Sequence, residues 1–483
     1  MKKRFRRLLT LPLLLLLCTG GCSTDPGSDP ASMPADIPEA EARWRAGFGS
    51  AEIALPDNGL PLYIAGYHNG WEISEVRDLC RVSALWLDAG GEGILLLSVD
   101  CVGLGSDTVS RIRAALEPLL REEAVHIHVI ATHDHAGPDT LGLWGPVGED
   151  GKNPGYMGNL YAACVRAAEE ALADRKTGRL FRSDVKTENM LRDSREPVIW
   201  DEVLHILRFE PDEDGSGGIR LLSYGAHAES LRGANTRLSR DYPGVLCDLI
   251  RERTGDDCLF LPGAVGGLVM TREFFDPFDA EANLLLTGEK LADYALSVSS
   301  SDERELSPVL YDEEISFSVP LDNTVFLYYK FLGILGNEAV CSSDPEIAGE
   351  TGYGLESCLS VLRLGDTALL LIPGEIFPEL VWGGGRENPS NPGAVNPEPL
   401  SGIMERYGLA DFFPVGLADD ELGYIVPPND FLTDTAAPYL NAAEPEDGSR
   451  HYEETNSVGV NCARKIAENL EKILKKADFA PKK

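Results

Sequence analysis

The chain has 483 residues, and its 78 acidic and 43 basic side chains give a formal net charge of -35. A surface of that sign repels phosphate backbones and anionic lipid, so no nucleic acid is expected as a partner. The simpler role of so acidic a surface is to keep the protein soluble.

The first 22 residues predict an export signal. The basic stretch MKKRFRR precedes an apolar run that is too short to span a bilayer as a mature helix. The run ends in TGGC, which resembles a bacterial lipoprotein box with Cys22 as the lipidated residue, although Thr19 stands where the box prefers leucine. A plain secretory peptide with an incidental cysteine is the alternative. Residues 23–45 predict a flexible tether, so we expect a protein that is exported to the bacterial cell envelope and anchored to its membrane by lipid.

Residues 46–483 show no internal repeat and no second linker, which favours one large domain. Apolar runs predict strands at 80–89, 93–104, 124–132, 203–210, 219–227, 258–264 and 367–375. Amphipathic stretches predict helices near 106–121, 156–174, 241–254, 278–298 and 455–475. This alternation predicts an α/β fold, in which mixed sheets flanked by helices form the layers of a single domain.

The cysteines do not predict a metal site. None of the ten stands in a C-x-x-C pair, which argues against a zinc ribbon. Export permits disulfides. Cys247 with Cys258, and Cys341 with Cys358, are near enough in sequence to close short loops, but the sequence does not fix the connectivity.

Polar residues follow several of the predicted strands at the point where each ends. They are Asp100, His133, His135, His227 and Glu375. In layered α/β proteins, functional residues gather just beyond the carboxyl ends of strands. We therefore expect these side chains to meet in a site at one edge of the sheet.

The histidines near residue 130 fall into two groups. His126 and His128 lie inside a predicted strand and are assigned no chemistry. His133 and His135 follow the strand, and an extended His-x-His places both rings on one side, roughly 6 to 7 Å apart at their Cα atoms. Both rings could bind one metal ion, or one could bind while the other faces a substrate. The continuation HDHAGPD lacks the HxHxDH pattern of metallo-β-lactamase-type hydrolases, which excludes that class.

The stretch THDHAGPDTLGLWG resembles the THxHSGP motif of the neutral/alkaline (non-lysosomal) ceramidase family. Further stretches stand in the family's order, namely SVDCVGL, LLSYGAHAESL, FLPGAVGG, LLIPGEIFPEL, GLADDELGYIVPP and HYEETNSVG. Together they cover residues 46–475, the family's catalytic domain, without the immunoglobulin-like domain that the family carries at its C-terminus. The resemblance implies a divergent member of that family.

The resemblance also implies a site. The family binds one zinc ion through two histidines, a glutamate and a tyrosine, which correspond here to His133, His227, Glu375 and Tyr424. Imidazole and carboxylate are usual zinc ligands, and a nearby dication favours loss of the tyrosine proton. His135 is then the catalytic residue, which would hold the oxyanion or pass a proton to the leaving amine of an N-acyl lipid.

Each of these assignments has a structural alternative. His227 could be a core histidine, Glu375 could lie near the start of a helix, and Tyr424 could be buried for its ring alone. Asp100 is a candidate to orient a zinc-bound histidine by accepting its second N–H, or else a capping residue at a turn.

Three departures from the family bear on the substrate. Gly263 stands where ceramidases have a serine, Asp420 and Glu421 replace the family's NDY, and Ala136 replaces the serine of SGP. Attack by water on a zinc-bound amide needs no serine, so hydrolysis is compatible with these changes while ceramide as substrate is in doubt.

Two stretches are candidates to line an apolar acyl channel, LGLWG at 141–145 and VFLYYKFLG at 325–333, although a run like the second is more often core or a buried strand. The sequence favours a Zn²⁺-dependent amide hydrolase that acts on a lipid or another small-molecule amide. The alternative is a non-catalytic relative, a surface lipoprotein that binds a ligand or metal without hydrolysis.

Overall fold

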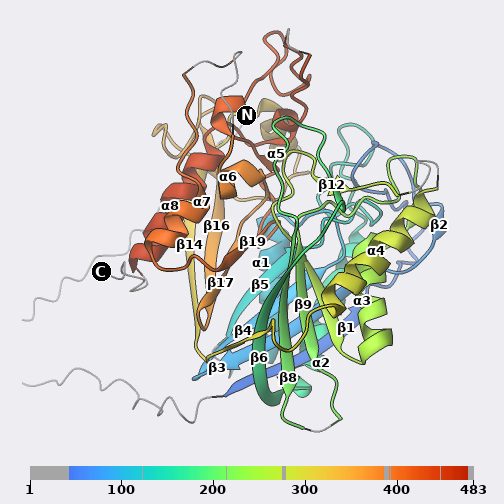
Figure 1. Ribbon diagram of the computed structural model, residues 1–483. Helices are drawn as coiled ribbons and strands as arrows, with labels where there is room; N and C mark the ends of the chain where they lie inside the picture. The colour runs from blue at the N-terminus through green and yellow to red at the C-terminus, as the bar shows by residue number, and fades with distance from the viewer. Residues whose placement is uncertain are drawn as a thin grey trace, which may run out of the picture. The chain divides into compact units, whose positions relative to one another are not determined.

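The apolar runs of the sequence assemble into two mixed sheets that pack face to face in the computed structural model (Figure 1). The structure describes residues 43–121, 123, 125–213, 215–274, 279–385, 391, 393–445 and 448–476. From residue 43 onward these belong to one compact unit. The predicted signal peptide with Cys22, and residues 23–42 of the predicted tether, lie outside the described residues.

The larger sheet contains nine strands among the described residues, in the order β11-β9-β8-β6-β1-β3-β4-β5, with β13 paired to β6. Its neighbours are antiparallel except for β11 with β9 and β4 with β5, which are parallel. The strands are β1 (Trp44–Glu52), β3 (Arg81–Ala89), β4 (Glu92–Val99), β5 (Val125–Ala131), β6 (Lys176–Lys186), β8 (Val203–Pro211), β9 (Ile219–Tyr224), β11 (Asp257–Pro262) and β13 (Arg304–Leu306).

The smaller sheet has the order β14-β16-β17-β19, with β15 paired to β16 and with β17 parallel to β19. Its strands are β14 (Leu310–Pro320), β15 (Ala339–Cys341), β16 (Tyr353–Leu364), β17 (Thr367–Leu371) and β19 (Phe412–Val415). Short strands form three further pairs in the described part of the chain: β2 (Glu75–Val76) with β10 (Arg237–Leu238), β7 (Leu191–Arg192) with β12 (Met270–Thr271), and β18 (Glu375–Ile376) with β20 (Tyr424–Ile425).

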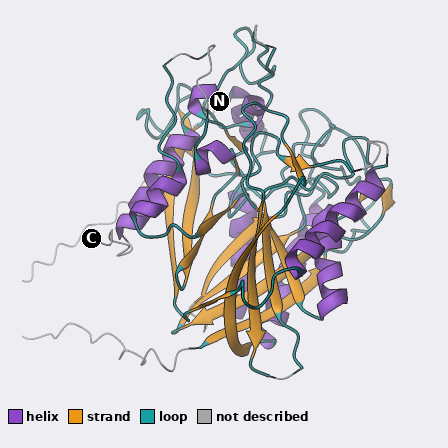
Figure 2. Cartoon of the chain, in the orientation of Figure 1, coloured by secondary structure: helices purple, strands orange, loops and turns teal. Residues whose placement is uncertain are grey.

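Helices cover the outer faces of both sheets (Figure 2). They are α1 (Ser106–Leu120), α2 (Pro154–Ala173), α3 (Asp241–Thr254), α4 (Ala280–Leu296), α5 (Thr324–Phe331), α6 (Pro378–Trp382), α7 (Leu400–Arg406) and α8 (Cys462–Lys476), with short 3-10 helices at Pro428–Asp430 and Glu453–Asn456. Helix α2 packs on β1 and β3, α3 packs on α4 and β11, and α8 packs on β14 and β16. Within the described residues, none of the helices combines the length and the apolar character that a membrane-spanning segment needs.

Two glycines of β1 explain how closely α2 approaches the sheet. A Cβ atom at Gly47 would lie 2.2 Å from the carbonyl oxygen of Ala171, and one at Gly49 would lie 2.1 Å from that of Ala167. Any larger side chain would push the helix outward. The helix begins after Asn153, whose side chain accepts the N–H groups of two first-turn residues.

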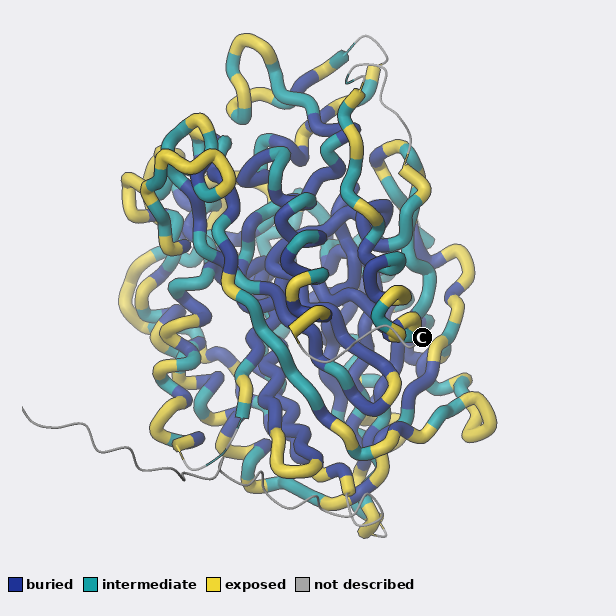
Figure 3. The backbone as a smooth tube through the Cα atoms, turned by 90° about the vertical axis from the view of Figure 1, so that its left-hand side faces the viewer, coloured by how far each residue is buried: buried dark blue, intermediate teal, exposed yellow. Residues whose placement is uncertain are grey.

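Buried residues concentrate in the strands and in the inner faces of the helices, while exposed residues lie mainly in the peripheral loops (Figure 3). One apolar cluster joins the two sheets, a second joins α1 and α2 to the larger sheet, and a third joins α8 to the smaller sheet. The molecule is therefore layered as helices, sheet, sheet and helices, which confirms the predicted α/β class with mixed sheets.

All the predicted strands and helices are present, with local differences. The strand predicted at 93–104 ends at Val99, the helix predicted from 455 begins at Cys462, and β1 starts at Trp44, inside the predicted tether. The interpretation of 325–333 as a buried strand is wrong. This stretch forms α5, because Asn323 caps its first turn, and Phe331 is 65% exposed.

The eight described cysteines are all free, so neither of the two short loops is closed by a disulfide.

Candidate metal centre

Side chains from distant parts of the sequence meet beyond the ends of the strands. His133 and His135 follow β5, and His227 follows β9. Glu375 and Tyr424 begin β18 and β20, which follow β17 and β19 along the chain and pair in parallel, so that these two residues lie opposite each other. The structure thus places the predicted site residues at the carboxyl ends of strands.

One carboxylate oxygen lies beside two imidazoles. Oε2 of Glu375 is 3.0 Å from Nε2 of His227 and 3.2 Å from Nε2 of His133. Nε2 of His133 is also 3.2 Å from Nε2 of His135. Ligand atoms of the three histidines lie within 4.8 Å of one another, which suits a single ion. Geometry alone does not separate His135 from the two predicted histidine ligands.

The donor set fits a divalent metal ion. Nδ1 of His133 donates to the carbonyl of Val102 at 2.7 Å, and Nδ1 of His227 donates to that of Val269 at 2.8 Å. These bonds place the N–H on Nδ1 and direct the Nε2 lone pairs to the centre of the cluster. Imidazole nitrogens and a carboxylate oxygen are ligands that zinc accepts.

Asp100 does not contact either predicted ligand histidine. Its carboxylate accepts the N–H of Arg81 at 2.9 Å and the hydroxyl of Thr132 at 3.5 Å. It does not cap α1 either, because the N–H of Ser106 donates to Asp420. The carbonyl groups of Val102 and Val269 take the orienting role that the sequence suggested for Asp100.

The backbone around the histidines is tightly constrained. His133 has a φ of +62°, a left-handed conformation that costs a non-glycine residue roughly 1–2 kcal/mol. A Cβ atom at Gly66 would lie 2.4 Å from Nδ1 of His135, so only glycine fits there. The ring of Tyr67 meets the ring of His135 edge-on, with 5.5 Å between centroids. Such constraints are common where a functional geometry must be held.

Burial and neighbouring charges set the protonation of the cluster. Burial lowers the pKa of His227, but the hydrogen bond and the charge of Glu375 outweigh it and raise the pKa to about 9. Burial would raise the pKa of Glu375, but His133 and His227 hold it well below its ordinary value. Burial, together with the charges of His133 and His227, lowers the pKa of His135 well below its ordinary value, so this ring is neutral.

Tyr424 is 5% exposed. Burial and the charge on Glu375 raise the pKa of its phenol well above the ordinary value. A phenolate at this position therefore requires a cation beside it, which is what a metal ion would supply.

Two solved structures share this arrangement of sheets and helices. The crystal structure of neutral ceramidase from Pseudomonas aeruginosa has a TM-score of 0.69 at 15% sequence identity, covering 92% of this chain and 76% of its own. A ceramidase complexed with C2 has a TM-score of 0.67 at 14% identity, covering 91% and 76%. The chain has the neutral ceramidase fold. No family model and no curated protein matches the sequence.

In this ceramidase fold, the histidine cluster opens into a cavity of about 700 Å³. One part of its lining is apolar and consists of Leu141, Leu143, Trp144, Phe326, Leu335, Leu355 and Val458. The stretch LGLWG and one residue of VFLYYKFLG thus line the cavity, as expected for them. Gly263, at the position that the FLPGAVGG stretch assigns to the family serine, is not among the described lining residues, and a Cβ atom there would lie 3.1 Å from the backbone of Gly225.

Sequence reasoning missed several residues of the ceramidase-fold cavity. Tyr67, Glu229, Arg192 and Arg232 line it. The loops that carry Tyr67 and Arg232 show a local excess of glycine and polar residues, but that signal does not identify which side chain points inward. Only the pairing of loops distant in sequence brings these four together.

Glu421, noted in the sequence as a change from the family's NDY, also lines the cavity. Its Oε1 accepts the N–H of Gly423 at 2.8 Å, and its Oε2 is buried without a partner among the described residues. Burial and the charges of Glu375 and Asp420 raise its pKa well above the ordinary value. The altered loop therefore places a neutral carboxyl group beside the cavity into which the histidine cluster opens.

Proposed function

We propose that this protein is a zinc-dependent hydrolase that cleaves the amide bond of an N-acyl lipid or a related acyl amide. The observation that carries the proposal is the convergence of three imidazoles and one carboxylate beside a partly apolar cavity, with Nε2 lone pairs directed inward. The fold of two ceramidases supports the same reaction class.

His133, His227, Glu375 and Tyr424 would hold the zinc ion, which when bound lowers the pKa of a water molecule and polarises the amide carbonyl. Main-chain carbonyls fix the tautomers of the two histidines before any ligand arrives. The protein therefore has little to reorganise at the centre, which favours catalysis by preorganisation.

His135 is suited to proton transfer at the amide nitrogen. It is neutral, it lies 3.2 Å from His133 through its Nε2, and its Nδ1 is buried without a partner. Gly66 and Tyr67 confine its ring to one orientation. A neutral imidazole in this place accepts a proton from attacking water and returns it to the leaving amine.

The apolar part of the cavity would bind the acyl chain. Each CH₂ group buried there contributes roughly 0.8 kcal/mol. Both structural neighbours are ceramidases, and one of them is complexed with C2, which supports an amide substrate of lipid type.

The proposal includes export and lipid anchoring at Cys22, supported by the N-terminal pattern. Expression of the full chain in a bacterial host, followed by fractionation, tests this part. The wild type is expected in the membrane fraction, and Cys22→Ala in the soluble fraction.

Zinc content and hydrolysis test the activity. Purified protein without residues 1–42 is expected to contain one equivalent of zinc by elemental analysis and to release fatty acid from a panel of N-acyl amines and ceramides. His133→Ala should lose both, and His126→Ala, which removes an exposed histidine of β5, should lose neither. Zinc without hydrolysis of any acyl amide would support the alternative of a non-catalytic binding protein.

A further inference from the structure

The cavity lining contains several arginines, although the chain as a whole is strongly acidic. Four lining residues are arginines, at positions 192, 195, 232 and 450, and the described lining contains no lysine. Across the whole chain, acidic residues outnumber basic residues by 78 to 43. A guanidinium group presents a planar fork of donors that matches carboxylates and phosphates better than an ammonium does.

Arg195 is a structural member of this group. It pairs with Asp430 at 2.8 Å, with Glu453 at 2.8 Å and with Glu454 at 2.9 Å, and all of these groups are buried. Its charge is fully compensated within the protein. It is therefore not available for a ligand.

Arg192 and Arg232 are different, because they share one carboxylate. Nη1 of Arg192 is 3.0 Å from Oε1 of Glu273, and Nη2 of Arg232 pairs with the same oxygen. Nη2 of Arg192 otherwise contacts the sulfur of Met270 at 2.7 Å, and thioether sulfur is a weak acceptor. Since a guanidinium has five N–H donors, most donors of this pair have no acceptor among the described residues.

Two neighbouring residues, Met270 and Tyr67, connect this arginine pair to the histidine cluster. Arg192 stands opposite Met270 in the β7–β12 pair, and Met270 in turn forms a backbone bridge with His227. Next to Arg232, a Cβ atom at Gly233 would lie 2.9 Å from the ring of Tyr67, the ring that meets His135 edge-on.

One further carboxylate, that of Glu229, belongs to the cavity lining. Glu229 accepts the hydroxyl group of Tyr67 through Oε2, and its other oxygen is buried without a partner among the described residues. Glu229 is therefore bound to Tyr67, while Glu273 is the carboxylate that directly pairs with the two guanidinium groups.

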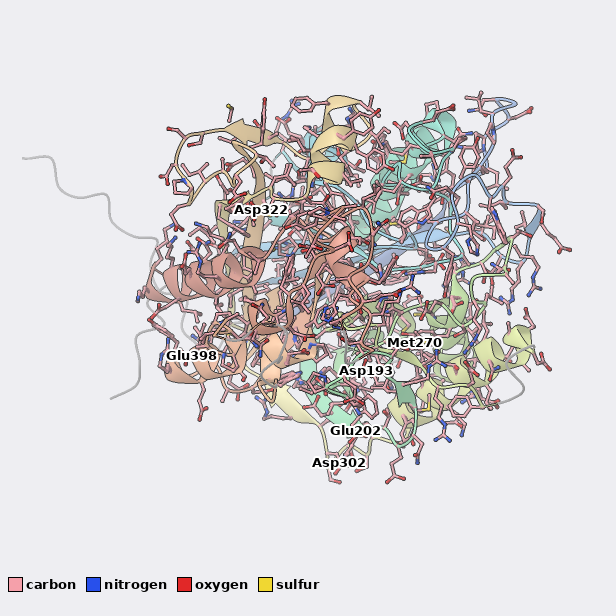
Figure 4. All side chains as sticks on the ribbon, turned by 90° about the horizontal axis from the view of Figure 1, so that it is seen from above. Asp193, Glu202, Met270, Asp302, Asp322 and Glu398 are labelled. Atoms are coloured by element: carbon pink, nitrogen blue, oxygen red, sulfur yellow. The ribbon has the colours of Figure 1, made fainter. Side chains whose placement is uncertain are left out.

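The arginine pair and the apolar lining come from different parts of the fold. Asp193, next to Arg192, and Met270 lie on one side in Figure 4, and Asp322, which precedes α5, lies on another. Phe326 of α5 is one of the apolar residues that line the cavity. The lining thus includes apolar side chains for an acyl chain and guanidinium groups for a polar group.

We propose that Arg192 and Arg232 bind an anionic group on the amine part of the substrate, either a carboxylate or a phosphate. This inference rests on the proposed function and names its substrate class: an acyl amide whose amine carries a negative charge close to the amide nitrogen. The guanidinium groups are reachable, because their side chains are 44% and 31% exposed. Glu273 holds the two arginines in place in the absence of the ligand and competes with it for the same donors.

The test measures binding rather than turnover. The probes are ketomethylene analogues of N-dodecanoylglycine, of its uncharged glycinamide and of N-dodecanoylethanolamine phosphate, in which CH₂ replaces the amide nitrogen and prevents hydrolysis. Calorimetry on the purified protein should show that the preferred anionic analogue binds at least tenfold more tightly than the neutral one. The carboxylate and phosphate arms distinguish the two sources of charge.

Variants sharpen the test in opposite directions. Arg192→Gln and Arg232→Gln should each reduce the anionic-to-neutral affinity ratio by roughly tenfold, the factor that corresponds to 1.4 kcal/mol. Glu273→Gln should raise that ratio, because it frees donors of both guanidinium groups, whereas a merely structural pair would make this change neutral or harmful. Arg272→Gln, which alters a neighbouring arginine outside the cavity lining, is the matched control and should leave the ratio as it is.

Equal affinity for all three analogues, or a ratio that does not respond to any of the variants, would overturn the anion site. Neither result would bear on zinc content or on hydrolysis of neutral acyl amides. The anion site and the proposed hydrolase function therefore fail by separate observations.

Discussion

Strand β5 leads to two buried histidine clusters that look similar in composition and differ in chemistry. The strand-end cluster contains His133, His135, His227 and Glu375. The mid-strand cluster contains His128, Asp312, Asp419 and Arg113. In the second, Nδ1 of His128 is 2.7 Å from Asp419 and Nε2 is 3.2 Å from Asp312, while Arg113 pairs with Asp419 at 3.0 Å.

The difference lies in the ratio of carboxylates to imidazoles. In the mid-strand cluster both ring nitrogens of one imidazole face carboxylates. Burial opposes its charge, but Asp419 and Asp312 outweigh this and raise the pKa of His128 to about 10. His128 and Glu314 with Asp419 have the spacing of a metal site. Both ring nitrogens of His128 are occupied by carboxylates, however, and Arg113 adds a second cation, so this cluster is a closed ion network.

In the strand-end cluster, three imidazoles share one carboxylate, their Nδ1 protons are mostly taken by carbonyl groups, and a cavity adjoins them. The Nε2 atoms of His133 and His227 face one carboxylate oxygen, and a metal ion would take the place of the proton that lies between them and Glu375. The comparison teaches that burial and spacing of His and Asp or Glu do not define a metal site, whereas ring nitrogens that converge beside an open cavity do.

The largest expected effect is loss of the metal centre. Glu375→Gln removes the carboxylate that faces two histidines, and we expect zinc affinity to fall by more than about a hundredfold, the upper range for changes to groups that only support a ligand. Hydrolysis should fall with it. Equilibrium dialysis against a zinc chelator measures the affinity. Glu379→Gln is the control, because Glu379 and Glu375 are equally buried, at 7% exposure each, and retention of zinc is expected there.

The mid-strand cluster should contribute to the stability of the fold rather than to metal binding. His128→Gln leaves two buried carboxylates with less positive charge, and breaking a buried ion network costs about 3–5 kcal/mol of unfolding free energy. Urea denaturation followed by circular dichroism measures this cost. His126→Gln alters the exposed histidine that pairs with the same Asp312, and its cost should stay below about 1 kcal/mol. Equal costs would remove the distinction between the two positions.

A rise in pH should weaken the contribution of the mid-strand cluster to stability and should strengthen zinc binding at the strand-end cluster. The pKa of His128 is raised to about 10, so its stabilising contribution is complete below about pH 6.5 and is lost as the pH rises through 10. At the strand-end cluster, zinc must displace a proton from His227, whose pKa is about 9. Each displaced proton contributes a factor of about ten per pH unit, and a Tyr424 phenolate would add a second one, so zinc affinity should rise at least about tenfold per pH unit below 9. Urea titrations and competitive zinc titrations between pH 7 and 9 check both slopes, and parallel slopes would contradict the comparison.

The smallest expected effect concerns the packing of Gly66 against the ring of His135. Gly66→Ala places a methyl group against its ring, and a shift of the imidazole should lower kcat by about tenfold, within the range for small misplacements of catalytic groups. Zinc content should stay at one equivalent. Gly70→Ala is matched, because Gly70 also has positive φ but no atom lies within 4 Å of its added Cβ. If both variants behave alike, backbone strain rather than contact with His135 explains the loss.

The layered fold was predictable, because apolar periodicity marks strands such as β3 and helices such as α2 without knowledge of their partners. That His133, His227 and Glu375 lie close together was predictable from their place after strands and from the motifs around them. The acceptors of their Nδ1 protons were not, since a carbonyl group is present at every residue and only the folded backbone selects Val102 and Val269.

Pairings that join distant residues were also beyond the sequence. His128 meets Asp312 and Asp419, which stand far along the chain, so its role could not be inferred from alternation in β5. The arginine pair depends on β7 meeting β12, two strands of two residues each, which no periodicity reveals.

The two-residue pairing of β18 with β20 has a consequence for how the chain holds together. It sets Glu375 directly across from Tyr424, while His133 and His227 follow β5 and β9 of the larger sheet. An ion bound by all four would cross-link the C-terminal part of the chain, from Glu375 onward, to the larger sheet. Chelation should then expose the C-terminal third to proteases before the rest of the chain is cut.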